Sequence, residues 1–117
     1  MSDMPQSAMT FAEFSRSIDE RKTGIYPGCD TGSHMELAYL ALGLAGESGE
    51  AVDKVKKHIR DGADLRAVVT ELGDVLWYLD RLARVCGADL AAVAALNMAK
   101  LDARKARGTI AGSGDSR

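Results

Sequence analysis

Two long stretches of this chain carry apolar side chains at the spacing of a helix. Between residues 35 and 60, and again between 65 and 85, Leu, Val, Ile and Ala recur every three or four positions, which places them along one stripe of an α-helix. The sequence therefore predicts helices over Met35–Arg60 and Leu65–Val85. Asp61-Gly62 is a helix stop, and Asp64 can cap the helix that follows.

Shorter patterns on either side predict two further helices. Thr10 and Glu13 have the spacing of a capping box, and Cys86-Gly87 is a natural helix end. The expected segments are a first helix from Thr10 to about Arg21, a loop over Lys22–Ser33, a fourth helix from Asp89 to about Arg107, and flexible ends over residues 1–9 and 108–117.

Length and composition favour a single all-α domain over residues 1–117, a helical bundle of about four helices. Aromatic residues make up only 5% of the chain, while Ala, Leu and Val are plentiful, which favours packed helices over a sheet. Because 117 residues bury only a modest core, we expect a second copy to complete it. A homodimer and a homotetramer are both open at this stage.

Charge and cysteine content indicate where such a chain works. The formal net charge of -2 provides no field that would attract nucleic acid or an anionic membrane, so neither is an expected partner. No apolar run has the length of a membrane span. Cys29 and Cys86 lack the spacing of a metal or redox motif, which suits the reducing cytoplasm.

Two pairs of acidic residues mark the predicted central helices. Glu47 and Glu50 are three residues apart, as are Glu71 and Asp74, and this spacing puts the members of each pair on one helix face. A helical wheel places both pairs beside the apolar stripe of their helix. If the two helices pack antiparallel through their stripes, four carboxylates meet at one edge of the seam.

Carboxylates held together repel one another unless a cation lies between them. Oxygen ligands suit a hard ion, so the expected metal is Mg²⁺, with Mn²⁺ as the alternative. Either pair alone is more often a solvated helix face, and Glu50 with Lys54 is an ordinary ion pair at i,i+4. Two pairs beside two stripes favour a metal site.

These residues resemble the MazG-like nucleotide pyrophosphohydrolases. The resemblance covers about residues 37–117. It is carried by the segment LGLAGESGE at residues 42–50, the basic run that ends at Lys57, the segment ELGDVLWY at 71–78, Asn97-Met-Ala-Lys100-Leu101 with Arg104, Arg107-Gly-Thr-Ile, and Gly112-Ser-Gly-Asp115.

The resemblance implies an all-helical enzyme that cleaves a nucleoside triphosphate to the monophosphate and pyrophosphate. It also implies that Glu47, Glu50, Glu71 and Asp74 ligate Mg²⁺, which holds the substrate phosphates. The chain departs from many members at Gly46, where they carry a further glutamate, and this bears on the number of metal ions. Relatives with this pattern include enzymes that cleave dUTP and dCTP, so base and sugar stay open.

Other polar residues are candidates for holding the substrate. In hydrolysis between the α and β phosphates, Glu47 and Glu50 are the candidates to accept the proton of the attacking water. Tyr78 lies four residues past Asp74 and is a candidate for the base pocket. The expected substrate-binding residues are Lys54, Tyr78, Asn97, Lys100 and Arg104, for which core packing or a solvated surface is the structural alternative.

Two other functions compete with the enzyme at this stage. A non-catalytic helical module that binds a divalent metal would show metal-dependent stability without turnover. A helical dimer with solvated carboxylates would show no effect of metal. Four carboxylates beside the seam favour the enzyme, because helix packing itself does not require them there.

Overall fold

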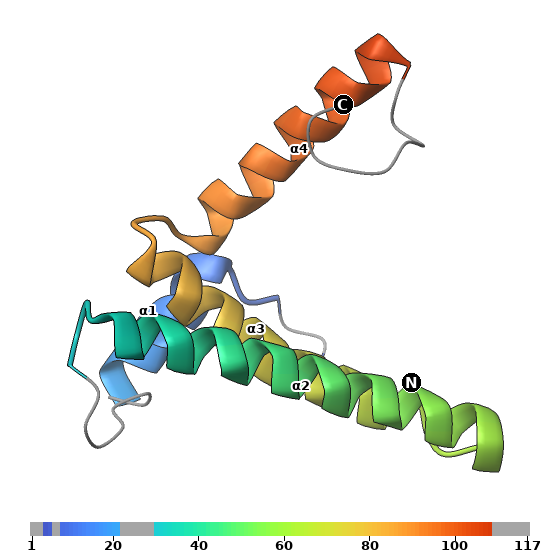
Figure 1. The fold of residues 1–117 in the computed structure, drawn as a ribbon. Helices are drawn as coiled ribbons and strands as arrows, with labels where there is room; N and C mark the ends of the chain where they lie inside the picture. The colour runs from blue at the N-terminus through green and yellow to red at the C-terminus, as the bar shows by residue number, and fades with distance from the viewer. Residues whose placement is uncertain (1–3, 6–7, 22–29, 109–117) are drawn as a thin grey trace.

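The computed structural model describes residues 4–5, 8–21 and 30–108, and this part of the chain is all-helical (Figure 1). Most of the expected flexible ends and most of the expected loop over Lys22–Ser33 lie outside the described residues, as does the motif Gly112-Ser-Gly-Asp115. The helices are α1 (Phe11–Arg21), α2 (His34–Asp61), α3 (Arg66–Val85) and α4 (Leu90–Arg107).

The centre of the molecule is an antiparallel pair formed by α2 and α3 (Figure 1). The turn between them spans residues 62–65. Gly62 ends α2 with φ 72°, in the left-handed region, and its amide donates to the carbonyl of His58 at 2.9 Å. So short a turn brings the middle of α2 opposite the middle of α3.

Local capping explains why the helix bounds agree with the sequence pattern to within one or two residues. The amide of Glu13 donates to Thr10 Oγ1 at 3.0 Å, and the amide of Ala92 donates to the side chain of Asp89 at 2.8 Å. Asp64 accepts from the amide of Arg66 at 2.9 Å. The first two contacts confirm the predicted starts of α1 and α4. The N-cap of α3 is Leu65, which makes no side-chain cap, and Asp64 lies one residue before it.

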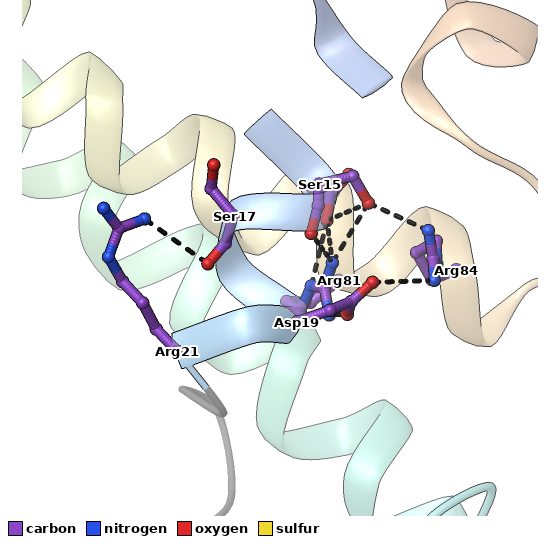
Figure 2. A network of polar contacts seen from close by, with 7 residues as sticks. Ser15, Ser17, Asp19, Arg21, Arg81 and Arg84 are labelled. Atoms are coloured by element: carbon purple, nitrogen blue, oxygen red, sulfur yellow. Dashed lines mark hydrogen bonds and ion pairs between the residues drawn. The ribbon is translucent and has the colours of Figure 1, made fainter. Parts of the chain in front are cut away.

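A buried polar network attaches α1 to α3 (Figure 2). Ser15 and Asp80 are both buried, and the Ser15 hydroxyl donates to Asp80 Oδ2 at 3.2 Å. Arg81 binds the same carboxylate and also pairs with Asp19 at 2.7 Å, while Arg84 donates to the Ser15 hydroxyl at 2.9 Å. The hydrogen bond from Arg81 is the main cause that lowers the pKa of Asp19.

The fourth helix points away from the α2–α3 pair (Figure 1). Helices α3 and α4 meet at an angle of 90°, and α4 makes its main contacts with α1 and α3. Leu90 at its start is buried, whereas Leu96 in its middle is 69% exposed. One copy of the chain therefore leaves most of α4 uncovered.

Much of the apolar surface predicted to face inward is exposed within one copy. Leu40 is 1% exposed, but Val52 and Ile59 farther along α2 are 67% and 79% exposed, and Leu72 on α3 is 50% exposed. The reason is geometric, because α2 and α3 cover each other along one face only and α1 lies at one end of the pair (Figure 1). The buried apolar residues of the described part are Ile18, Leu40, Ala51, Ala83 and Leu90.

Within the described ranges, no single helix is long and apolar enough to cross a membrane, although α3 and α4 taken together, as a bent pair, have the length and composition to do so.

Candidate functional site: an acidic group on α2 and α3

Three of the four predicted carboxylates converge across the seam between α2 and α3. Glu47 from α2 and Glu71 and Asp74 from α3 each place a carboxylate oxygen within 4.8 Å of the other two. Two oxygens on opposite sides of a Mg²⁺ ion lie about 4.2 Å apart, since each Mg–O bond is about 2.1 Å. A small inward movement of these side chains therefore matches the oxygen-only ligand set of a hard cation.

The fourth predicted carboxylate, Glu50, lies outside this group of three. It is exposed on α2, three residues after Glu47. Burial raises the pKa of Glu47, and the negative charges of Asp74, Glu71 and Glu50 raise it further, in that order. Glu50 is thus close enough to act on the electrostatics of the group, which in the absence of a cation is under mutual repulsion.

Lys54 provides a positive charge at the edge of the acidic group. Its Nζ lies 3.8 Å from Glu71 Oε1, and both side chains are less than one-third exposed. The sequence allows Lys54 to pair with Glu50 at i,i+4, but the structure pairs Lys54 with Glu71. Lys54 instead reaches across the seam to α3.

The other lysines of the basic run are engaged elsewhere on α2. Lys56 and Lys57 pair with Asp53 at 3.1 and 2.7 Å, and these two cations hold the pKa of Asp53 at about 2. Asp53 is therefore an ordinary ion-paired carboxylate and does not belong to the acidic group.

An open pocket of about 270 Å³ adjoins the acidic group. Glu47 and Asp74 form its polar side, and Trp77 and Tyr78 form its aromatic side. The two rings meet edge to face, with centroids 4.9 Å apart and planes at 74°. The structure thus places Tyr78, predicted as a base contact, in a pocket together with two of the predicted metal ligands.

Trp77 and Tyr39 are residues of this region that the sequence analysis did not assign to it. Trp77 appears on the helical wheel away from the apolar stripe, yet it lines the pocket. Burial raises the pKa of Tyr78, and the neighbouring Tyr39 raises it further. The signal for Tyr39 was its spacing, because Tyr39, Gly43 and Glu47 follow one another at intervals of four on one face of α2.

The predicted substrate contacts on α4 stand apart from the acidic group within one copy. Asn97 and Lys100 are exposed and Arg104 is half-buried. None of the three lines the pocket beside Glu47 and Asp74, and α4 points away from the pair that carries it (Figure 1). The structure therefore brings Lys54 and Tyr78 to the acidic group, but not the three residues of α4.

Comparison with known proteins places the chain in a family. Residues 36–108, which hold almost all of α2 and the whole of α3 and α4, match the MazG nucleotide pyrophosphohydrolase domain. The Gene 37 protein of Mycobacterium phage L5 is 46% identical to this chain, in an alignment that covers 81% of the chain and 90% of that protein. No solved structure matches the chain. The resemblance seen in the motifs is confirmed, and the chain belongs to the MazG nucleotide pyrophosphohydrolase domain family.

Proposed function

We propose that this protein is a Mg²⁺-dependent nucleoside triphosphate pyrophosphohydrolase that converts a ribo- or deoxyribonucleoside triphosphate to the monophosphate and pyrophosphate. The observation that carries the proposal is the convergence of Glu47, Glu71 and Asp74 within 4.8 Å beside a pocket with aromatic walls. A polyphosphate needs a cation, and a nucleobase needs a flat apolar surface. The carboxylates would hold the cation, and the rings of Trp77 and Tyr78 beside them would provide the surface for the base.

Glu47, Glu71 and Asp74 would hold the cation, with Mn²⁺ as a substitute for Mg²⁺. A hard divalent ion in such a site neutralises phosphate charge and makes water more acidic. Glu50 is assigned here as the acceptor of the water proton, because it lies next to the group but outside it. Lys54, which lies at the edge of the group, would bind phosphate oxygens.

Water attacks the α-phosphorus, its proton passes to the carboxylate of Glu50, and the bond from the α-phosphorus to the bridging oxygen breaks so that pyrophosphate leaves. The side chain of Tyr78 would contact the base.

We also propose that the working form is a homo-oligomer in the cytoplasm. The exposed apolar side chains of α2, α3 and α4 support this, since Ile59, Leu72 and Leu96 are 79%, 50% and 69% exposed. A second copy would cover them, and its α4 would provide a route for Asn97, Lys100 and Arg104 to reach phosphates. Light scattering should give a mass of at least two chains, and a single-chain mass at working concentration would contradict the proposal.

The test of the activity is pyrophosphate release from a panel of canonical ribo- and deoxyribonucleoside triphosphates, with Mg²⁺ and with chelator. The wild type should require the metal, and Asp74→Asn should be inactive. Asp53→Asn is the matched control, because Asp53 pairs with Lys56 and Lys57 instead of joining the group.

Equal rates with metal and with chelator would refute the proposal. Stabilisation by Mg²⁺ without turnover of any triphosphate would favour the non-catalytic metal-binding module instead.

A further inference from the structure

The contact between Gly43 and Tyr78 joins α2 to α3 next to the acidic group. Gly43 lies one helical turn before Glu47, and Tyr78 lies one turn after Asp74. The ring of Tyr78 occupies the space that a Cβ at Gly43 would need. Any side chain at Gly43 would therefore force this ring to move.

Gly43 differs in this respect from the other glycines of the same helix. A glycine in a helix costs roughly 1 kcal/mol relative to alanine. At Gly46 and Gly49 a Cβ would meet nothing within 4 Å. Only at Gly43, among the three, does the structure show a close approach that requires the absence of a side chain.

Two further residues border the Tyr78 side chain. Tyr39 on α2 is close enough to Tyr78 to raise its pKa, after the larger effect of burial. Trp77 on α3 meets the Tyr78 ring edge to face, with ring centroids 4.9 Å apart. The Tyr78 side chain is thus bordered from α2 by Gly43 and Tyr39 and from α3 by Trp77.

We propose that Gly43 is a positioning residue for recognition of the nucleobase, because it lets Tyr78 lie against α2 as the aromatic wall beside the carboxylates. Tyr39, one turn before Gly43 on α2, is a neighbour of the same side chain. This inference rests on the proposed function and extends it. A nucleoside triphosphate carries a flat base at one end and a polyanion at the other, and the pocket presents a ring at one side and metal-binding oxygens at the other.

The matched comparison is Gly43→Ala against Gly46→Ala, which make the same change one turn apart on α2. Both variants gain helix propensity, but only the first displaces Tyr78. Gly43→Ala should raise KM for the preferred triphosphate about tenfold, the scale of one lost stacking contact, with kcat changed much less. Gly46→Ala should keep the KM of the wild type.

Inorganic tripolyphosphate separates base recognition from phosphate recognition, because it has the phosphates and no base. Its inhibition constant should be the same in Gly43→Ala and in the wild type. If Gly43→Ala raises the inhibition constant of tripolyphosphate as much as it raises KM, Tyr78 does not act through the base and the proposal is overturned.

Trp77 is the one tryptophan of the chain, so its fluorescence reports on the ring beside it without any turnover. Gly43→Ala should shift its emission, while Gly46→Ala should not. In a Tyr78→Ala background, Gly43→Ala should change neither emission nor KM further, because the colliding ring is gone. An undiminished effect in that background would contradict the proposal.

The two proposals fail in different ways. If the wild type releases pyrophosphate but Gly43→Ala and Gly46→Ala have the same KM and emission, the positioning role is wrong and the hydrolase stands. If the wild type has no turnover, the proposed function fails. Titration of Trp77 fluorescence with the nucleotide panel then measures binding to Gly43→Ala and Gly46→Ala without turnover. Equal nucleotide affinities in these two variants would refute the positioning role.

Discussion

Lys54 Nζ lies 3.8 Å from Oε1 of Glu71, so a cation from α2 borders the acidic group that α2 and α3 form together. The pair crosses the seam between the helices, and both side chains are less than one-third exposed. The ammonium group neutralises part of the charge that Glu47, Glu71 and Asp74 accumulate. In the proposed enzyme it would therefore compete with the metal ion for the same carboxylate, and it would border the site of the phosphates.

Lys54→Met should separate these two roles. Without the competing ammonium, the metal-free site should bind Mg²⁺ more tightly, by less than about fivefold, since a partly exposed pair contributes about 1 kcal/mol at most. The KM for triphosphate should rise, because a phosphate contact is lost. Calorimetric titration with Mg²⁺ and steady-state kinetics measure the two effects. Lys56→Met, which removes a partner of Asp53 instead, is the control, and the assignment fails if both variants behave alike.

Glu47 and Glu50 should respond differently to neutralisation. Glu47→Gln removes a member of the carboxylate group, so both Mg²⁺ affinity and turnover should collapse. Glu50→Gln should lower kcat by about 10²-fold, at the lower end for general base catalysis, with a smaller loss of Mg²⁺ affinity. Calorimetry and pyrophosphate release on the two variants make the comparison. Equal loss of metal affinity in both would show that Glu50 is a ligand and not a separate base.

The raised pKa of Glu47 predicts how pH acts on the metal-free protein. Burial and the neighbouring carboxylates raise this pKa above its ordinary value of 4.5. Between the pKa of the unfolded chain and the raised pKa of the folded state, the folded state binds more protons than the unfolded chain. The free energy of unfolding should then fall as pH rises through this window and recover as pH is lowered. Urea titrations of the wild type and Glu47→Gln, across that window and in chelator, test this, and the variant should lack the trend.

The same protonation should oppose metal binding. Mg²⁺ needs ionised carboxylates, so its affinity should fall as pH drops through the raised pKa of Glu47. Calorimetry at neutral pH and near 4.5 measures the change. An affinity that does not vary between these conditions would place the metal away from Glu47.

Asp80 should anchor α1 to α3. It is fully buried, and its carboxylate receives hydrogen bonds from Ser15 and Arg81. Asp80→Ala would leave these donors facing a void and should lower the free energy of unfolding by about 3 kcal/mol, the cost of removing one partner from a buried ion pair. Asp19→Ala, at a carboxylate that is 45% exposed, should cost less than about 1 kcal/mol. Urea denaturation gives both values, and equal costs would contradict a special role for Asp80.

The helices were predictable because their ends are set by local chemistry. Thr10, Gly62 and Asp89 act within one turn of their own position, so a single sequence shows them. The direction of α4 was not predictable, because it depends on how Leu90 and its neighbours dock and not on any local signal. The polar network was missed for a similar reason, since Ser15 and Asp80 are 65 residues apart, and Asp80 beside Arg81 looks like an exposed ion pair.

The acidic group was predictable in outline, because helical periodicity placed both pairs at the edge of the seam. The structure brings Glu47, Glu71 and Asp74 together, as the wheel implied, and leaves Glu50 outside. Three residues are about 60° short of a full turn, so one member of such a pair can face the seam while the other faces solvent. The wheel gives the side of a helix on which a residue lies, but the packing of the two helices decides which carboxylates meet.

The four-residue turn that begins at Gly62 has a consequence for how this protein can change. Every carboxylate of the acidic group, and the aromatic wall beside it, belongs to one hairpin of consecutive sequence. Inserting even a single residue into this turn would shift α3 relative to α2 and move Glu71 and Asp74 out of register with Glu47. Substitutions outside α2, α3 and this turn leave the length of the connection unchanged, so the geometry of the acidic group depends on one short segment of the sequence.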